Sequence, residues 1–483
     1  MEDQKYETVV GLEIHAELNT QSKLFCNCEV SFGEEANVHI CPICSGMPGI
    51  LPVLNKRALE FAVRAALAMN CKITPFSKFD RKNYFYPDLP KGYQISQKHL
   101  PLGKDGYVDY EFAGETKRVR IAQVHLEEEA AKLIHADVTG DPSKSYVDFN
   151  RAGVPLLEIV SQPDLRSPDE AIAYWRTVKE ILEYLEVSDC NMEEGSFRCD
   201  ANISLRLVGS KVFGTRTELK NKNSFQHVVT ALEYEQKRQA RILDNGGEIE
   251  QATLLYDLNT GRTSPMRSKE DSHEYRYFPE PDLVPVEVDA EWVEQTQSTL
   301  PELPAERRKR FVAEYDIPAY DAQFLTATHQ MADFFDETAQ LSGDAKASSN
   351  WIMSDLSKLL NSEGVEIQDS RVTPVHVSQL IELIKAGKIS GKIAKSVLVD
   401  VFKTGKAPNQ IVEEKGLSQI SDALAIESIV DQVIAENPGS AQDYRNGKKK
   451  AIGFLVGQVM RATKGKANPQ LVNQTLRQRL EKQ

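Results

Sequence analysis

Acidic and basic side chains recur at alternate positions in three short stretches of the chain. The stretches are "VVGLEIHAEL" (9–18), "RCDANISLRL" (198–207) and "TRTELKN" (215–221). Strict alternation of polar and apolar residues predicts half-buried strands, in which all the polar side chains point to one face. If the three strands share a sheet, that face gathers Glu13, His15, Asp200 and Glu218.

These residue types suit a site at which a divalent cation meets a triphosphate. Carboxylates hold Mg²⁺, while Arg and Lys hold the phosphate oxygens. His15 is a poor ligand for Mg²⁺, so we expect it to support a ligand or to bind a softer divalent ion. The chain has no GxxxxGK[ST] motif, so a bound nucleotide must lie on the sheet. Further acids stand in adjoining segments, at Glu127–Glu129 and at Glu193 and Glu194.

A purely structural account of the same pattern is a solvated sheet face with many ion pairs. For any one strand we favour that account, because antiparallel sheets commonly expose one polar face. Three such strands in one chain favour the catalytic interpretation instead. The cations among the acids are then candidates for binding phosphate, and they are Arg198, Arg206 and Lys220.

Four of the seven cysteines form two close pairs, a C-x-C pair followed after twelve residues by a C-x2-C pair. Two such pairs can complete a tetrahedral thiolate site with no open position, which is typical of structural zinc. We therefore expect Zn²⁺ in a knuckle over residues 26–44. The alternatives are four free thiols, or a redox dithiol that lacks its usual βαβ setting. The predicted ligands are Cys26, Cys28, Cys41 and Cys44.

The length of 483 residues is too great for one hydrophobic core, so we expect two or three domains. No apolar run approaches ~18 residues, and the N-terminus lacks the basic start and apolar core of a signal peptide. We therefore expect a soluble cytoplasmic protein, in which clustered cysteines serve as thiols or metal ligands rather than disulfides.

The helix and strand patterns predict a multidomain α+β protein. Alternating strands and a few helices fill residues 1–292, and strand signals are absent after that region. Helical patterns fill residues 293–405 and 406–483, which we expect to be a helical domain and a small basic helical tail domain. Glycines and a proline break this half into short helices, with a boundary near Gly405.

Three helices are predicted inside the first region. One covers residues 55–70 and another covers residues 227–243. The third begins after Ser167 as N-cap, with Pro168 at the first helical position and Glu170 completing a capping box.

Charge is unevenly distributed along the chain. The net charge of −13 argues weakly against a protein that coats nucleic acid. From Asp443 to the C-terminus, however, ten Lys or Arg stand against two Asp or Glu, a net charge of +8. Such a tail can grip a polyanion locally, because charge contacts are short-range in salt. The basic residues that we single out are Lys448, Lys449, Lys450, Lys464 and Lys466.

Several long motifs together resemble one known family. They are "VGLEIHAEL", "FDRKNYFYPDLPKGYQISQ", "VDFNRAGVPLLEIVSQP", "MEEGSFRCDANISLR", "ELKNKNSF", "YRYFPEPDLVP" and "GFLVGQVMRATKGKANPQLVN". On these motifs, nearly the whole chain is similar to the B subunits of the tRNA-dependent amidotransferases. That family converts Glu-tRNA(Gln) or Asp-tRNA(Asn) to the amide form.

The resemblance implies a fold, a reaction and partners. The fold is a cradle-shaped antiparallel-sheet domain related to glutamine synthetase, followed by a helical domain and a helical tail. ATP, with Mg²⁺, phosphorylates the side-chain carboxylate of the mischarged tRNA, and ammonia then displaces phosphate. A separate glutaminase A subunit supplies the ammonia through a tunnel, and a small C subunit straps the two together. The family's metal cluster falls here on Glu13, His15, Glu127, Glu128, Glu193, Asp200 and Glu218.

The stretch "DRKNYFYPDLPKGYQ" interleaves cations with aromatic residues. Bases of a single-stranded CCA end stack on aromatic faces, and cations meet its phosphates. The alternative is a hairpin whose aromatic residues belong to the core. The candidates for the tRNA acceptor end are Lys82, Tyr84, Lys91 and Tyr93, and we expect the basic tail to contact the tRNA elbow.

Two other functions compete with this one. A non-catalytic tRNA-binding scaffold predicts that Glu13, Asp200 and Glu218 tolerate alanine with effects on stability alone. An ATP-dependent ligase of small amino acids predicts activity on free glutamate without tRNA, and it leaves the basic tail unexplained.

Overall fold

The structure is a computed structural model. It describes residues 5–134, 143–222, 224–257, 260–268, 275–417, 423–463 and 467–481. The chain divides into two compact units, Met1–Leu303 and Pro304–Gln483. Together they make a multidomain α+β protein, as the sequence predicts.

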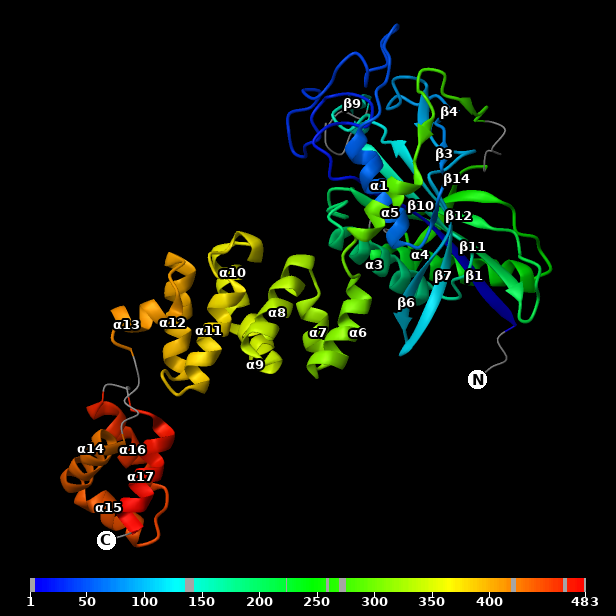
Figure 1. The fold of residues 1–483 in the computed structure, drawn as a ribbon. Coiled ribbons are helices and arrows are strands. Elements are labelled where there is room, and N and C mark those ends of the chain that lie inside the picture. The colour runs from blue at the N-terminus through cyan, green and yellow to red at the C-terminus, as the bar shows by residue number, and fades with distance from the viewer. Residues whose placement is uncertain are drawn as a thin grey trace. The chain divides into compact units, whose positions relative to one another are not determined.

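A nine-stranded sheet forms the centre of the first unit (Figure 1). Neighbouring strands are antiparallel except for β12 and β13, which run parallel. In order across the sheet, the strands are β14 (Arg262–Ser268), β13 (Ala252–Asp257), β12 (Thr217–Lys222), β11 (Phe197–Leu207), β1 (Tyr6–Glu17), β10 (Pro155–Ser161), β7 (Glu115–Glu128), β6 (Gly103–Phe112) and β2 (Lys72–Ile73).

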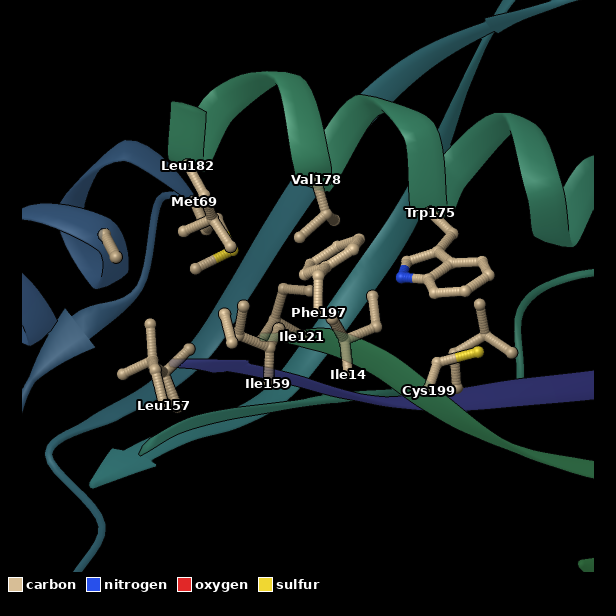
Figure 2. Packing of buried hydrophobic residues seen from close by; sticks show 14 of the residues in the cluster. Ile14, Met69, Ile121, Leu157, Ile159, Trp175, Val178, Leu182, Phe197 and Cys199 are labelled. Carbon is tan, nitrogen blue, oxygen red and sulfur yellow. The ribbon is translucent and has the colours of Figure 1, made fainter. Parts of the chain in front are cut away.

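One face of this sheet is apolar and is covered by helices. The helices are α1 (Lys56–Ala68), α3 (Pro168–Tyr184) and α4 (Phe225–Asp244). Trp175 and Val178 of α3 lie over Ile14 of β1 and Phe197 of β11, in a continuous buried core (Figure 2). Burying this face stabilises the unit through the hydrophobic effect, and the alternation of each strand leaves the polar residues on the other face.

The three predicted helices and the three predicted strands are all present, with ends shifted by a few residues. Ser167 caps α3, since its Oγ accepts a hydrogen bond from the Glu170 N–H at 3.1 Å, and Pro168 is the first helical residue. The second half of the predicted capping box is wrong in detail. The Glu170 carboxylate accepts from the N–H of Arg166 (2.7 Å), one residue before the N-cap, and it also pairs with Lys117.

Short strands and a helix complete the first unit. A three-stranded sheet stands beside the main one, and two strand pairs and α5, which packs on α1, lie at the periphery. The three-stranded sheet has the order β15 (Phe278–Pro279), β4 (Asp80–Asn83) and β5 (Tyr93–Ser96); the pairs are β16 (Val286–Glu287) with β3 (Phe76–Ser77) and β8 (Lys132–Ile134) with β9 (Tyr146–Asp148); and α5 covers Ala290–Ser298.

The second unit is helical throughout its described residues, as the loss of strand signals predicts. Its first helices are α6 (Pro304–Tyr315), α7 (Ala319–Leu325), α8 (His329–Ser342), α9 (Ala345–Asn350), α10 (Ser357–Glu363), α11 (Pro374–Lys385), α12 (Gly391–Thr404) and α13 (Pro408–Glu414), with a π-helix at Trp351–Leu356 and a 3₁₀ turn at Ile367–Asp369. Four more helices share a separate core: α14 (Ala423–Glu436), α15 (Pro438–Arg445), α16 (Ala451–Ala462) and α17 (Pro469–Glu481). The boundaries predicted at residues 292 and 405 stay predictions.

Within the described parts of the chain, helices are all too short or too polar to cross a membrane.

Candidate active site

Strand pairing brings the predicted acids onto one face of the sheet. In the register of β1 with β11, Glu13 stands opposite Asp200. On the other side of β1, His15 stands opposite Glu158 of β10, and Glu158 in turn stands opposite His125 of β7. Residues directly opposite each other on neighbouring strands point to the same face. His15, Glu158 and His125 therefore form one row across the three strands β1, β10 and β7.

Two histidines and two carboxylates meet in this row. His15 Nε2 lies 3.5 Å from a Glu158 oxygen and 3.8 Å from a Glu127 oxygen. His125 Nε2 lies 3.4 Å from Glu158 and 3.8 Å from Glu127. One ligand atom each from His15, Glu127 and Glu158 fall within 4.8 Å of one another, which is a spacing that one cation can bridge. His15 Nδ1 is buried and has no hydrogen-bond partner among the described residues.

A second group of carboxylates lies beside the first. Lys220 Nζ contacts Asp200 at 2.6 Å and Glu218 at 2.9 Å. Thr253 of β13 donates to the other oxygen of Glu218 at 2.9 Å. Asn202 donates to Glu13 at 2.9 Å. Each acid is therefore held by a fixed donor from its own strand or a neighbouring one.

The two groups line one polar cavity of about 460 Å³. Its remaining wall comes from the segment around the three-stranded sheet and from the strands β12 and β13. Lys82 reaches into it with its ammonium 5.1 Å from the centre of the Tyr275 ring. The lining residues are Glu13, His15, Lys82, Ser96, Lys98, Gln123, His125, Glu127, Glu158, Asp200, Arg216, Glu218, Lys220, Gln251, Thr253, Tyr275 and Tyr277.

Burial and charge set the protonation of this cavity. Burial raises the pKa of Glu13, and the neighbouring Glu158 raises it further. Burial also opposes ionisation of Glu158, but His125 and His15 outweigh it and hold the pKa of Glu158 well below its usual range. For His125, burial favours the neutral form, yet Glu158 and Glu127 raise its pKa to about 10. The cavity thus holds paired opposite charges.

A second hollow of about 490 Å³ adjoins the cavity along the same sheet face. It shares Glu13, Arg216 and Gln251 with the cavity. Its other walls include apolar side chains, among them Val9 and the half-exposed Phe213 in the loop between β11 and β12.

Several sequence-predicted residues lie outside the cavity. Glu128 follows Glu127 in the strand and so points to the opposite face, where it pairs with Lys91 and accepts from the Ile95 N–H. Glu193 is exposed in the turn before β11. The cations also divide: Arg198 pairs with Glu129 at 2.5 Å and Arg206 pairs with Glu7, so of the three predicted phosphate candidates only Lys220 lines the cavity.

Of the candidates for the tRNA acceptor end, some line the cavity and others lie outside it. Lys82 lines the cavity, and its ammonium lies 5.7 Å from the ring centre of the half-buried Tyr84. The Lys91 side chain is buried against Glu128, and Tyr93 stacks under the Arg81 guanidinium at 4.2 Å. The exposed aromatic residues of this stretch are Phe85 and Tyr86.

The tail lysines are exposed where the structure describes them. Lys448, Lys449 and Lys450 directly precede α16, and among the described residues Lys448 pairs with Asp443. Lys464 and Lys466 lie outside the described residues.

The four predicted cysteines meet in one cluster after β1. One Sγ from each lies within 4.8 Å of the others, and Cys44 Sγ is 3.9 Å from both Cys28 Sγ and Cys41 Sγ. A tetrahedron with Zn–S bonds of about 2.3 Å has S···S edges of about 3.8 Å, so the arrangement fits zinc. The pKa of Cys44 is lowered to about 4, chiefly by a hydrogen bond from Cys26.

Several cavity residues were not predicted as site residues from the sequence. Glu158 lies within the long motif "VDFNRAGVPLLEIVSQP" and alternates with Leu157 and Ile159, which is the same signal that marked Glu13. His125 stands two residues before Glu127 and shares its face for the same reason. Arg216 also shares this signal, because it alternates with Glu218 and Lys220 in "TRTELKN". Lys98 and Thr253 carry no comparable pattern, because a loop and a parallel strand bring them to the site.

Comparison with known proteins identifies the family of the chain. A family model described as the GatB/GatE catalytic domain matches residues 8–294, and one described as a GatB domain matches residues 333–480. Among similar curated proteins is the B subunit of the aspartyl/glutamyl-tRNA(Asn/Gln) amidotransferase of Moorella thermoacetica, 56% identical over 99% of this chain and 100% of its own. The proteins of the same name from Thermoanaerobacter pseudethanolicus and Geotalea uraniireducens are 56% and 55% identical over 99% of this chain, which covers 100% and 99% of them. The chain belongs to the GatB/GatE family.

Proposed function

We propose that this chain is the B subunit of an aspartyl/glutamyl-tRNA(Asn/Gln) amidotransferase. It uses ATP to phosphorylate the side-chain carboxylate of Glu-tRNA(Gln) or Asp-tRNA(Asn), and it then exchanges phosphate for ammonia. The observation that carries the proposal is the single cavity in which the clustered acids and histidines meet Lys82, Lys98, Arg216 and Lys220. Charged tRNA is used in protein synthesis, so we place the reaction in the cytoplasm.

Activation by ATP answers a chemical difficulty. Ammonia does not displace an oxide from a carboxylate, because oxide is a very poor leaving group. When a carboxylate oxygen attacks the γ-phosphorus, ADP leaves and an acyl phosphate forms. Ammonia then attacks the acyl carbon, phosphate departs, and the nitrogen loses a proton. Positioned cations stabilise the charge that develops on phosphate oxygens in both steps.

The two acidic groups fit divalent cations of different character. Glu13, Asp200 and Glu218 offer oxygen ligands alone, which suits Mg²⁺. His15 with Glu127 and Glu158 offers nitrogen and oxygen, which also suits a softer divalent ion. Ions bound there would neutralise the phosphates of ATP and polarise the phosphorus–oxygen bond. Glu128 and Glu193 are left out of this ligand set, because their side chains lie away from the cavity.

The adjoining hollow suits the nucleoside part of ATP. It shares Arg216 and Gln251 with the acidic cavity. Its apolar wall at Val9 and Phe213 can cover an adenine ring, while the triphosphate reaches Arg216 and Lys220. Arg198 and Arg206 form ion pairs with Glu129 and Glu7, so we no longer assign them to the phosphates.

The tyrosine-lined wall suits the aminoacylated end of tRNA. Tyr275 and Tyr277 line the cavity. Phe85 and Tyr86, which follow β4 in the sequence, have exposed aromatic rings. Terminal bases stack on such faces. We keep Lys82 and Tyr84 as acceptor-end residues and assign Lys91 and Tyr93 to the internal packing that their contacts describe.

The tail lysines Lys448, Lys449 and Lys450 suit the tRNA elbow as exposed phosphate contacts. Lys464 and Lys466 remain predicted contacts.

The cysteine cluster suits a structural Zn²⁺, held by Cys26, Cys28, Cys41 and Cys44. Four sulfur ligands leave no open position, so the metal would fix the loop and take no part in the reaction. Ammonia comes from a separate glutaminase A subunit, with a small C subunit completing a heterotrimer. No motif in the sequence identifies a Ser–Ser–Lys or Cys–His glutaminase arrangement, so we assign the supply of ammonia to the partner.

The test is amide formation on mischarged tRNA with ammonium chloride as nitrogen donor, in the assembled enzyme. We expect Glu218→Gln to lower both ATP-dependent amide formation and its linked ADP release by about 10²–10³-fold. Glu115→Gln, an exposed change at the start of β7, is the matched control and should leave both unchanged. Full activity in Glu218→Gln would favour a tRNA-binding scaffold, and equal activity on free glutamate would favour a small-amino-acid ligase.

A further inference from the structure

Lys23 is a fully buried lysine in the loop that follows β1, beside the cysteine cluster. Its ammonium donates to the carbonyl oxygens of His39 (2.8 Å) and Phe149 (3.1 Å) and lies 3.6 Å from Cys44 Sγ. Among the described residues, no carboxylate forms an ion pair with it. A buried ammonium needs a compensating anion, and the Cys44 sulfur is the one partner here that can carry negative charge.

The loop of the cysteine cluster is bound to a second loop, residues 149–154, that leads into β10. The His39 N–H donates to Asn150 Oδ1 at 2.9 Å, and Asn150 Nδ2 donates to the Glu35 carbonyl at 2.8 Å. The Phe149 N–H donates to Asn37 Oδ1 at 2.7 Å. These bonds and the Lys23 ammonium join the two loops at several points.

The far end of loop 149–154 is bound to the catalytic strands. The Gly153 N–H donates to the Glu129 carbonyl, and the Glu129 N–H donates to the Val154 carbonyl, both at 2.9 Å. Glu129 directly follows β7, which carries Glu127. The strand β10 begins at Pro155, directly after the loop, and carries Glu158.

Gly153 lies where loop 149–154 passes Lys23 and the cysteine cluster. Its φ of +86° is the left-handed conformation that glycine tolerates, and a Cβ there would lie 3.6 Å from Cys44 Cβ and from Lys23 Cδ. It would also lie 4.0 Å from Glu128 Oε2. These are ordinary van der Waals distances, so the Gly153 backbone lies next to both Cys44 and Lys23, and its left-handed conformation is what favours glycine.

We propose that Lys23 is a positioning residue that couples the cysteine cluster to the cavity: by joining Cys44 to loop 149–154, it holds Glu158 and Glu127 in place for their cation. The proposal rests on the proposed zinc, because four free thiols would give neither a fixed anion nor a rigid anchor. The zinc site then forms part of the support of the active site.

The test uses Lys23→Met, which keeps the length of the side chain and removes its charge, in the assembled enzyme. Lys72→Met, at an exposed position of β2, is the matched control. We expect Lys23→Met to lose zinc to excess chelator about tenfold faster than the wild type. We also expect its Kd for Mn²⁺ at the cavity, measured by electron paramagnetic resonance, to rise about threefold. Neither readout depends on turnover.

A second variant protects the test against misfolding. Asn150→Ala removes two of the bonds between the loops without touching a cysteine or a cavity residue, and we expect the same direction in both measurements. If Lys23→Met lacks the near-ultraviolet circular dichroism of the wild type, Asn150→Ala decides alone. Unchanged zinc loss and Mn²⁺ affinity in a zinc-replete protein overturn the coupling alone. Wild-type protein purified without zinc overturns the zinc assignment and the coupling together.

Discussion

Glu13 and Ile14 are neighbours in β1, yet they serve opposite faces of one sheet. Ile14 is fully buried in the apolar core beneath α3 (Figure 2). Glu13 points into the acidic cavity, where burial and the charge of Glu158 raise its pKa. Period-two alternation alone separates them, so a single strand contributes to stability with one face and to chemistry with the other.

The two faces differ in what they do to the free energy of folding. Apolar contacts on the helix-covered face favour the folded state. On the cavity face, acids are gathered before any cation arrives, and burial of an acid such as Glu13 disfavours its ionised form. Functional sites commonly sacrifice stability in this way. Substitutions on the two faces should therefore have opposite signatures.

Glu13→Gln tests the cavity face and should give the largest effect. We expect ATP-dependent amide formation with ammonium chloride to fall about 10²–10³-fold, because the carboxylate charge is lost while the bond from Asn202 can remain. Because the pKa of Glu13 is raised in the folded state, its ionisation destabilises that state as pH rises above about 4.5. Urea denaturation at pH 8 should show Glu13→Gln at least as stable as the wild type. A marked loss of stability with normal turnover would reverse the roles of the two faces.

Ile14→Ala tests the helix-covered face. We expect unfolding free energy to fall by about 2–5 kcal/mol, because the substitution leaves a cavity under Trp175 and Phe197. The measurement is urea denaturation, followed through the transition in which the unit Met1–Leu303 unfolds. Amide formation per folded molecule at low temperature should stay within about twofold of the wild type, and Ile14→Val should show the same pattern at about 0.5–1.5 kcal/mol. If Ile14→Ala lost as much amide formation per folded molecule as Glu13→Gln, the roles of the two faces could not be separated.

The sequence predicted the part of the site that depends on strand alternation. Glu13, His15, Asp200 and Glu218 share a face because each sits at an alternate position of its strand, and that shared face could be anticipated from the pattern alone. The same rule would have found Glu158 and His125. The rule also separates Glu127 from Glu128, because adjacent residues of one strand point to opposite faces.

The rest of the site depends on topology that local pattern does not contain. Thr253 reaches Glu218 because β13 joins the sheet parallel to β12. Lys98 comes from a loop, and Arg198 pairs with Glu129, a partner 69 positions away in the chain, and does not line the cavity. The four cysteines were predictable as a cluster because their spacing is local. The bonds from that cluster to loop 149–154 were not.

The basic tail extends the comparison to charges that are exposed instead of buried. We expect replacement of Lys448, Lys449 and Lys450 by Glu to weaken tRNA binding by about tenfold or more near physiological salt and to flatten the dependence of log Kd on log salt. Filter binding over a salt series measures both. ATP hydrolysis on a minimal substrate should be untouched, because these lysines are remote in sequence from every cavity residue. Unchanged tRNA affinity at all salt concentrations would remove the tail from the interface.

Glu17 gives the smallest effect and the sharpest separation of strain from function. It lies on the polar face of β1, two positions beyond His15, but it lines a different hollow with Arg151 and Asp189. Burial, with the charge of Glu129, raises its pKa to about 7. A carboxyl group whose pKa is raised on folding stabilises the protonated folded state, so its contribution is lost as pH rises from about 4.5 to 7.

We therefore expect Glu17→Gln to match the wild type in unfolding free energy at pH 4.5 and to exceed it by about 1–2 kcal/mol at pH 8. Amide formation should be unchanged, because Glu17 lines its own hollow and not the cavity. Urea denaturation at the two pH values, with turnover at pH 8, measures both. If turnover falls as it does in Glu13→Gln, the chemistry extends along the whole polar face of β1. If Glu17→Gln is no more stable than the wild type at pH 8, then Arg151 and Arg198 fully compensate the charge of the ionised Glu17. A buried acid on this face then need not weaken the fold.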